Sequence, residues 1–422
     1  MIEGGRPLSG NVRVAGNKNG ALPILAACLL TDEEVRLRNV PRIRDVEAMV
    51  EILADLGAQA EWTGDNEVRV RAGDLRKTEV DATLATRIRA SFLLAGPLLT
   101  RHGRATLPPP GGDVIGRRRL DPHIHAFQQL GAEIDINGRY EFSAGRLAGT
   151  QLFLDEASVM GTENTIMAAV LARDETVIGN AACEPHVQDL CRFLVSLGAR
   201  IDGIESNVLR IQGVGSLHGG EWSIGPEHIE VASFVGLAAV TGGELTIESC
   251  VPKDLQSILS NFAKLGVQVD VMEDAIHVPA GQELVVQDDL GGQIPKIESG
   301  VWPAFPADAT SIALTVATQA RGAILIFEKM FESRLFFVDK LVGMGARIIL
   351  CDPHRAVVTG PARLYGERLE SPDIRAGMAM LIAALAADGV STIGNVPQID
   401  RGYERIDERL RELGASVERV EG

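Results

Sequence analysis

Apolar residues recur along this chain in two patterns, and together they predict two kinds of helix in each of six repeated units. In the first pattern an amphipathic run ends in Leu or Met, then Gly, then Ala or Val, and these tripeptides recur about 70 residues apart along the whole chain. The glycine suits the left-handed position that ends a helix, where a side chain would clash. The amphipathic helices are predicted at residues 45–56, 121–130, 189–197, 253–265, 333–344 and 401–413.

Alternating apolar and polar residues follow several of these glycines and predict half-buried strands, as at 132–136 and 267–271. The second kind of helix is apolar nearly all round, which is typical of a helix buried in a core. These core helices are predicted at residues 21–30, 90–99, 166–171, 232–240, 311–317 and 376–386. One long irregular stretch, 288–307, interrupts the regularity, and loops of that length are often functional. The patterns therefore predict an α/β protein of six similar units.

Polar and charged residues lie at or just before the start of every core helix, where unpaired N–H groups and the helix dipole attract anions. They are Lys18, Asn19, Arg87, Arg89, Glu163, Asn164, Glu227, Glu230, Asp308, Asp373 and Arg375. Further arginines occupy loops at 117–119, 334 and 401. Any one of them alone reads as a solvated surface charge, but guanidinium groups bind phosphate and carboxylate in a bidentate way. A cluster of them indicates a small ligand with several anionic groups.

Composition excludes several classes of protein. The chain has 422 residues with 45% hydrophobic content, enough for two domains of three units each. Its net charge of −16 argues against binding to nucleic acid or anionic membranes. Apolar runs reach only about eleven residues, short of the ~20 that span a bilayer, and no basic-then-apolar leader is present, so a cytoplasmic protein is predicted. The five cysteines lack metal-binding spacing, so neither a metal nor a cofactor is expected.

Short stretches around the polar residues resemble a known family. These stretches are 16–25, 89–91, 110–116, 305–308, 331–334, 373–376 and 399–405. In this order they resemble the signatures of the UDP-N-acetylglucosamine enolpyruvyl transferases, or 1-carboxyvinyltransferases, in the form with Asp in place of the usual active-site Cys. The resemblance runs from about residue 3 to residue 420. The sister family that acts on shikimate 3-phosphate matches less well, because its own lysine and glycine motifs do not occur here.

The resemblance implies two domains, each an inside-out α/β barrel, or α/β prism, of three βαβαββ units. The first domain would span 20–228, and the second would comprise 1–19 plus 229–422, joined by a double-crossover hinge that closes a cleft and excludes water. The chain itself supports the return of its N-terminus to the second domain. Residues 8–14 match the later stretches 147–153 and 364–369, so they are a fragment of a repeat that needs a partner.

The resemblance also implies a reaction. In that family the enolpyruvyl group of phosphoenolpyruvate passes to the 3′-hydroxyl of UDP-N-acetylglucosamine by addition and elimination, with release of phosphate. This is the first committed step of peptidoglycan synthesis, and so belongs to cell wall biogenesis, cell shape and cell division. The substrates are the only partners implied, and the oligomeric state is left open.

The resemblance also implies the residues of the site. The residues implied to bind phosphoenolpyruvate are Lys18, Asn19, Arg118, Arg334, Arg375 and Arg401, of which Lys18, Arg118 and Arg401 take the phosphate and Arg334 and Arg375 the carboxylate. The implied catalytic residues are Lys18, Arg401, Asp308 as the base for the hydroxyl, Asp113 as the acid, and Asp373 as an aid to proton transfer at the methyl carbon. The residues implied along the nucleotide sugar are Asn19, Arg89, Arg118, Arg119, Leu120, Asp121, Pro122, His123, Ser158, Val159, Gly161, Asp308 and Met330.

Several features leave alternatives open. From the residues alone, Asp308 reads as a helix N-cap before Ala309. Glu156 replaces the usual Lys, and Met160 is an additional residue, so a different nucleotide acceptor is the alternative substrate. The alternative class of protein is a noncatalytic repeat scaffold, although a scaffold does not need the cationic side chains that the resemblance assigns to the site. Because a carboxylate attacks an epoxide far less readily than the thiolate of Cys-bearing relatives, Asp113 implies insensitivity to fosfomycin.

Overall fold

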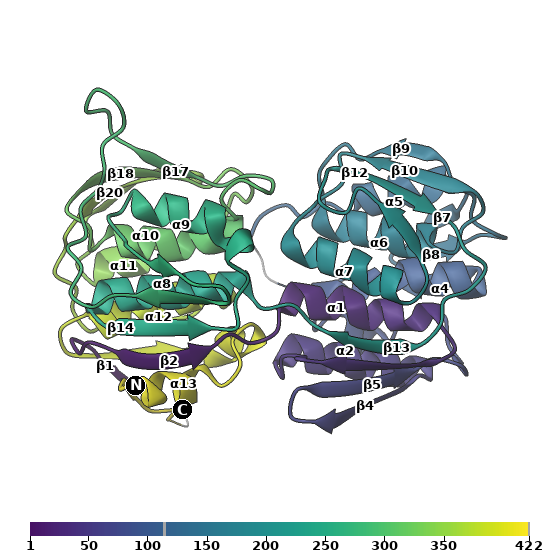
Figure 1. Ribbon diagram of the computed structural model, residues 1–422, viewed down its shortest axis with the longest axis horizontal. Coiled ribbons are helices and arrows are strands. Elements are labelled where there is room, and N and C mark those ends of the chain that lie inside the picture. Colours follow the sequence, from purple (N-terminus) through teal and green to yellow (C-terminus); the bar gives the residue numbers. More distant parts are fainter. Residues whose placement is uncertain (113–114, 421–422) are drawn as a thin grey trace. The chain divides into compact units, whose positions relative to one another are not determined.

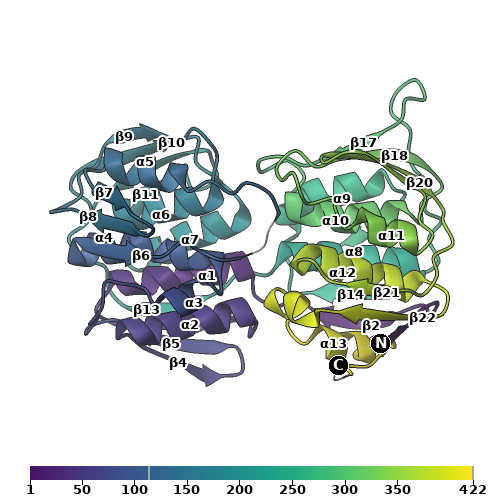
Figure 2. The same cartoon turned by 180° about the vertical axis from the view of Figure 1, so that it is seen from behind.

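The computed structural model describes residues 1–112 and 115–420 of the chain. Its contacts divide these residues into two compact units. Unit A comprises residues 16–112 and 118–225, and unit B comprises residues 1–15, 115–117 and 226–420. Among the described residues the strands form six sheets, and each unit has its sheets outside and its helices within (Figures 1 and 2). The predicted α/β architecture of six similar units is therefore confirmed.

Unit A holds three of the sheets. Their strands, in spatial order, are β13 (Gly220–Ser223), β3 (Glu34–Arg38), β5 (Glu67–Arg71) and β4 (Gln59–Gly64); β6 (Arg104–Leu107), β8 (Tyr140–Ser143) and β7 (Glu133–Ile136); and β11 (Arg200–Asp202), β12 (Val208–Gln212), β10 (Glu175–Gly179) and β9 (Gln151–Phe153). The helices are α1 (Lys18–Ala27), η1 (Cys28–Leu30), α2 (Arg44–Leu56), α3 (Ala82–Ala85), η2 (Arg89–Leu94), α4 (Ala95–His102), α5 (Asp121–Gln129), α6 (Val159–Ala169) and α7 (Pro185–Ser196).

Unit B repeats the arrangement. Its strands, in spatial order, are β15 (Asp270–Val271), β16 (Ala275–Val278), β14 (Glu244–Glu248) and β2 (Ser9–Arg13); β17 (Lys296–Glu298), β18 (Gly322–Phe327), β20 (Arg355–Gly360) and β19 (Ile348–Asp352); and β21 (Arg368–Glu370), β22 (Val390–Gly394), β1 (Ile2–Glu3) and β23 (Ser416–Val417). The helices are α8 (His228–Thr241), η3 (Pro252–Leu255), α9 (Gln256–Ala263), η4 (Ala307–Ala309), α10 (Thr310–Ala317), α11 (Val338–Gly343), α12 (Ile374–Ala386), η5 (Val396–Arg401) and α13 (Ile406–Glu412).

The N-terminus completes two sheets of unit B, as the repeated sequence predicts. Strand β2 runs parallel to β14, in the same way that β9 runs parallel to β10 and β21 to β22. Strand β1 lies between β22 and β23, where Ile2 pairs with Ser391 on one side and Val417 on the other. The first residues therefore supply strands to units whose other parts lie hundreds of residues later.

The two helix patterns predicted from the sequence correspond to two positions of helices in each repeated unit, one central and one next to a sheet. In unit B the apolar helices α8, α10 and α12 pack against one another at the centre, and every residue of α12 from Ile374 to Leu385 is buried. The amphipathic helices lie toward the sheets and end as predicted, because the glycine of each tripeptide has a positive φ, from 82° at Gly266 to 107° at Gly57. No helix in the described part of the chain has the length and apolar character needed to cross a membrane.

Several predicted boundaries are wrong. The core helix predicted at 166–171 begins at Val159, and the segment predicted as one helix at 90–99 starts as the 3₁₀ helix η2 before α4. The helix predicted at 189–197 begins earlier, with Pro185 in its first turn, where proline is well tolerated. The helix predicted at 401–413 begins only at α13, because Arg405 before it has a left-handed φ of 43°. Helix α11 is likewise shorter than the predicted 333–344, and the stretch 288–307 contains strand β17.

Candidate active site

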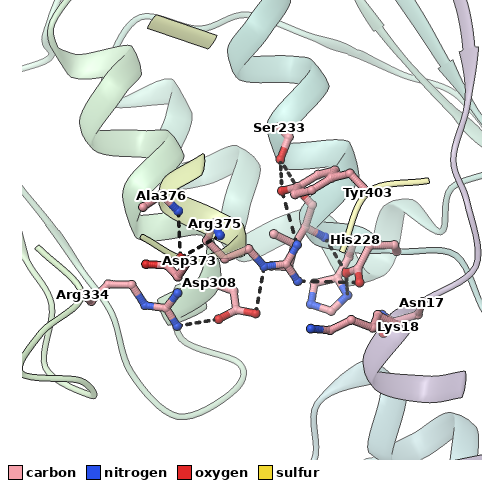
Figure 3. Close-up of polar contacts among 12 residues, drawn as sticks. Asn17, Lys18, His228, Ser233, Asp308, Arg334, Asp373, Arg375, Ala376 and Tyr403 are labelled. Atoms are coloured by element: carbon pink, nitrogen blue, oxygen red, sulfur yellow. Dashed lines mark hydrogen bonds and ion pairs between the residues drawn. The ribbon is translucent and has the colours of Figure 1, made fainter. Parts of the chain in front are cut away.

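The three core helices of unit B begin close together, and charged side chains gather at their starts (Figure 3). Glu227 is the N-cap of α8, Asp308 lies in η4 just before α10, and Asp373 is the N-cap of α12. Arg375 follows in the first turn of α12, and Arg334 comes from the loop after β18. The structure therefore brings together the predicted base and both predicted carboxylate-binding arginines.

Asp308 bridges the two arginines with its two carboxylate oxygens. Nη2 of Arg334 donates to Oδ1 at 2.7 Å, and Nε of Arg375 donates to Oδ2 at 3.1 Å. Both arginine side chains are almost fully buried, whereas 30% of the Asp308 side chain is exposed. Charge-assisted hydrogen bonds of this kind fix the orientation of the two guanidinium groups. An anionic ligand that binds the same arginines must share these donors with Asp308 or replace its carboxylate.

The alternative interpretation of Asp308 as a helix cap is wrong. Neither η4 nor α10 has a side-chain capping bond, and the residue at the N-cap of α10 is Ala309. Asp373, in contrast, is a true cap: its Oδ1 accepts from the backbone N–H groups of Arg375 and Ala376 at 2.8 and 2.9 Å. Asp373 thus holds the start of α12 and with it the backbone of Arg375.

Arg375 is enclosed on its remaining sides. Its Nη1 donates to the hydroxyl of Tyr403 at 3.3 Å, and its Nη2 lies 3.8 Å from Oε2 of Glu227. Burial lowers the pKa of Arg375, but Tyr403, Asp308 and Glu227 together outweigh burial and raise that pKa. The neighbouring His228 is buried, and burial followed by the charge of Arg375 lowers its pKa to about 4. This part of the site therefore holds a fixed cation beside a neutral imidazole at neutral pH.

The turn that carries Met330 and Arg334 rests on the buried carboxyl group of Glu328. Its Oε1 accepts from the N–H groups of Met330 and Phe331 at 2.8 and 3.2 Å, and its Oε2 accepts from the Thr310 hydroxyl at 2.8 Å. Burial raises the pKa of Glu328, against the charge of Arg334. The Arg334 guanidinium then lies over the ring of Phe331, at 5.3 Å from its centroid. Arg401, at the end of η5, donates to Oε1 of Gln398 at 2.9 Å.

In unit A the predicted lysine lies at the start of a core helix. Asn17 caps α1 by accepting from the N–H of Gly20 at 3.0 Å, and Lys18 is the first helical residue. Nζ of Lys18 lies 3.4 Å from Oδ2 of Asp45, and both side chains are nearly buried. Lys18 is therefore a positioned cation, with Asn19 beside it in the same first turn.

Arg89 ties the predicted nucleotide-binding loop to the core of unit A. Its Nη2 donates to the backbone oxygens of Arg118 and Arg119, at 2.8 and 3.3 Å. Burial, and then the charge of Arg118, lower the pKa of Arg89 to about 10, and Glu156 acts in the opposite direction. Arg119 itself forms ion pairs with Asp121 and Asp155, at 3.2 and 3.3 Å.

The other predicted nucleotide-binding residues of unit A lie at the starts of α5 and α6, two helices that contact each other. Leu120 precedes α5, and Pro122 stands in its first turn against Gly161, where an added Cβ would lie 3.0 Å from the proline. Ser158 caps α6 by accepting from Gly161 N–H at 3.2 Å, and Val159 follows it. His123 is buried, with 1% of the residue exposed, and its Nδ1 lies 2.9 Å from the amide nitrogen of Asn164.

Some residues of the site escaped the sequence interpretation. Tyr403 lies within a matched stretch but was assigned no role, and Asp45, His228 and Glu328 have no local signal that separates them from surface polar residues. Asp113, the predicted acid, lies outside the described residues. Within residues 1–112 and 115–420, no three His, Cys, Asp or Glu side chains are grouped as metal ligands.

Glu163 in α6 supplies a prediction about stability. It is 1% exposed, its Oε1 has no hydrogen-bond partner, and burial followed by the charge of Glu184 raises its pKa well above the ordinary value. In the unfolded chain a glutamate ionises above pH ~4.3, whereas the folded protein must keep Glu163 protonated, so folded stability falls as pH rises from that value toward the folded pKa. We expect Glu163→Gln to unfold at a higher temperature than the native protein near pH 8 but not near pH 4.

Thermal unfolding at both pH values measures this difference. Glu175→Gln is the matched control, because Glu175 belongs to the same unit and about half of its side chain is exposed. The control should unfold like the native protein at both values. An advantage of Glu163→Gln that is equal at both pH values would contradict a raised pKa.

The chain resembles known proteins over nearly its whole length. The profile of the EPSP synthase family, 3-phosphoshikimate 1-carboxyvinyltransferase, matches residues 2–410. The chain belongs to the EPSP synthase family. The chain is 57% identical to a UDP-N-acetylglucosamine 1-carboxyvinyltransferase of Bradyrhizobium diazoefficiens, over 100% of the chain and 97% of the relative. It is 56% identical to the enzyme of the same name from Treponema pallidum, over 99% of the chain and 98% of the relative.

Solved structures agree with this family member's fold. The crystal structure of the enolpyruvyl transferase NikO from Streptomyces tendae superimposes with a TM-score of 0.88 at 26% identity, covering 98% of the chain and 97% of NikO. An EPSP synthase structure from Acinetobacter baumannii superimposes with a TM-score of 0.75 at 17% identity, covering 98% of the chain and 97% of that protein, and supports the fold alone.

Proposed function

We propose that this chain transfers the enolpyruvyl group of phosphoenolpyruvate to the 3′-hydroxyl of UDP-N-acetylglucosamine and releases phosphate. It would thereby catalyse the first committed step of peptidoglycan synthesis. The observation that carries the proposal is the 57% identity, over the full chain, to a relative named for this activity. The geometry of unit B supports it independently, because a partly exposed carboxylate held by two buried arginines suits a reaction between an anion and a hydroxyl group.

The reaction needs three proton transfers. The sugar hydroxyl must lose a proton as its oxygen bonds to C2 of phosphoenolpyruvate, and C3 must gain one to become a methyl group. The tetrahedral adduct then loses phosphate and a methyl proton, which restores the double bond. We assign the first transfer to Asp308, and protonation at C3 to Asp113 with help from Asp373. General acid and base groups of this kind contribute about 10²- to 10⁴-fold each.

The remaining residues bind the substrates. Arg334 and Arg375 are assigned to the carboxylate of phosphoenolpyruvate, since both guanidinium groups are fixed and buried beside Asp308. Lys18, Arg118 and Arg401 are assigned to its phosphate. The residues assigned to the nucleotide sugar are Asn19, Arg89, Arg118, Arg119, Leu120, Asp121, Pro122, His123, Ser158, Val159, Gly161, Asp308 and Met330.

A phosphate-release assay tests the proposal. Purified protein with phosphoenolpyruvate should release phosphate only when UDP-N-acetylglucosamine is present. Release that requires a different uridine nucleotide would establish another acceptor, and no release with either would favour a scaffold. We also place the protein in the cytoplasm, since phosphoenolpyruvate and nucleotide sugars are cytoplasmic metabolites and its five cysteines are free thiols.

Arg401→Ala should lower activity far more than stability. Loss of a charge-assisted hydrogen bond to the transferring phosphate is worth about 1.5 to 3 kcal/mol, or roughly 10- to 150-fold in kcat/KM. Steady-state kinetics and thermal unfolding measure the two effects. Arg405→Ala is the control, because 65% of the Arg405 side chain is exposed and it pairs only loosely with Glu408, at 3.8 Å. Equal rates for Arg401→Ala and native protein would remove Arg401 from the site.

A further inference from the structure

Tyr403 lies entirely within unit B, with its ring and its hydroxyl both against Arg375 (Figure 3). The side chain is among the largest that are fully buried, and the guanidinium carbon of Arg375 lies 5.5 Å from its ring centroid. The hydroxyl oxygen accepts from Nη1 of Arg375 at 3.3 Å and lies 2.9 Å from Oγ of Ser233. Tyr403 therefore contacts Arg375 through stacking and a hydrogen bond at once.

The direction of the hydrogen bonds follows from counting protons. The Ser233 hydroxyl donates to the backbone oxygen of Ile229 at 2.8 Å, which uses its single proton. Ser233 must then accept from the Tyr403 hydroxyl. The Tyr403 oxygen is left as an acceptor, and the proton that it receives comes from Arg375. A series of hydrogen bonds, all donated in the same direction, thus connects the Arg375 guanidinium to the first turn of α8.

This series of hydrogen bonds differs from the other contacts of Arg375 in one respect. Asp308 exchanges a proton in the proposed reaction, so its bond to Nε of Arg375 changes in strength during each turnover. Glu227 lies 3.8 Å away and is an ion-pair partner rather than a close hydrogen-bond acceptor. Tyr403 keeps its proton, because burial raises the pKa of its hydroxyl. The Tyr403–Ser233 contact is therefore constant while the carboxylate changes.

We propose that Tyr403 and Ser233 are positioning residues that hold the Arg375 guanidinium in the orientation required to bind the carboxylate of phosphoenolpyruvate. The inference rests on the proposed function, in which Arg375 binds that carboxylate. Neither residue touches a substrate in this scheme. Their effect must then appear in the affinity for one substrate and not for the other.

The test is the kinetics of Tyr403→Phe and Ser233→Ala with each substrate varied in turn. Tyr403→Phe keeps the ring but removes the acceptor, and should raise KM for phosphoenolpyruvate by about 10-fold, the equivalent of about 1.4 kcal/mol. KM for UDP-N-acetylglucosamine should stay within about twofold of the native value. Ser233→Ala should change the same constant in the same direction, by less. Thermal unfolding of both variants reports any general loss of structure.

Tyr365→Phe is the matched control. Arg363 lies over the Tyr365 ring at 5.4 Å in the same unit, but half of Tyr365 is exposed. Removing the Tyr365 hydroxyl group should leave the KM values for both substrates unchanged. A Tyr403→Phe variant with native KM for phosphoenolpyruvate, or with both KM values raised equally, would overturn the inference. Native protein that releases no phosphate would instead overturn the proposed function, and the positioning role with it.

Discussion

Replacing Asp308 with Ala is expected to lower kcat by about 10²- to 10⁴-fold, the usual contribution of a general base. In the structure its carboxylate is partly exposed and joined to both Arg334 and Arg375, so the substitution removes the proton acceptor and releases two buried cations. Asp308→Asn keeps the shape of the side chain and one oxygen, but it cannot take the proton. Both variants should therefore fail in the phosphate-release assay.

Comparing the two Asp308 variants separates catalysis from folding. Removing one partner of a buried ion pair is destabilising by about 3 to 5 kcal/mol, so Asp308→Ala should also unfold at a lower temperature. Asp308→Asn should lose less stability and nearly as much activity. Asp339→Asn is the control, because 64% of the Asp339 side chain is exposed and its ion-pair partner is the adjacent Lys340. An Asp308→Asn variant that retains a rate within threefold of native would remove Asp308 as the base.

Asp113→Cys is expected to make the protein sensitive to fosfomycin, while the native protein keeps its activity after prolonged exposure. The prediction rests on sequence, since Asp113 lies outside the described residues. A thiolate is a strong nucleophile toward the epoxide, whereas a carboxylate is a weak one. Activity after increasing times of incubation should fall progressively for the variant alone, and its intact mass should increase by one fosfomycin adduct. Before exposure the variant should turn over substrate.

A second substitution locates the reaction with the antibiotic. Cys351 is the exposed native cysteine, and the other four are buried. Adding Cys351→Ser to Asp113→Cys should leave the inactivation unchanged, because the introduced thiol is the one attacked. Time-dependent inactivation of the native protein would contradict the assignment of Asp113 to the position of the family's cysteine.

Local patterns predicted the repeats but could not place every helix start. The glycine tripeptides mark real helix ends because the left-handed conformation is a local property of the backbone. The start of α6 was missed because Thr162, Glu163 and Asn164 look like surface residues, yet all three are buried. Asn164 satisfies its amide by bonding Phe92 O at 2.8 Å and Gly96 N–H at 3.0 Å. Those partners belong to two other helices, η2 and α4, and local periodicity does not indicate them.

The candidate site shows the same limit more sharply. The matched stretches singled out Asp308, Arg334 and Arg375, but the choice between a cap and a reactive carboxylate depends on arginines 26 and 67 residues away in the chain. Tyr403 and Ser233 are separated by 170 residues, so nothing in either stretch indicates that their hydroxyl groups meet. These contacts depend on the packing of α8, α10 and α12 and on the segments that bring Arg334 and Tyr403 to them.

Strand β1 has a consequence for the order in which the protein is assembled during synthesis. Ile2 and Glu3 lie between β22 and β23, and β2 pairs with β14, so residues 2–13 pair with their neighbouring strands only after residues 244–248 and 390–417 have been synthesised. Unit A, in contrast, consists of residues 16–112 and 118–225, and all of them are synthesised before most of unit B has left the ribosome. Unit A can therefore fold co-translationally, whereas unit B cannot complete its last sheet until residues 390–417 have been synthesised and have left the ribosome.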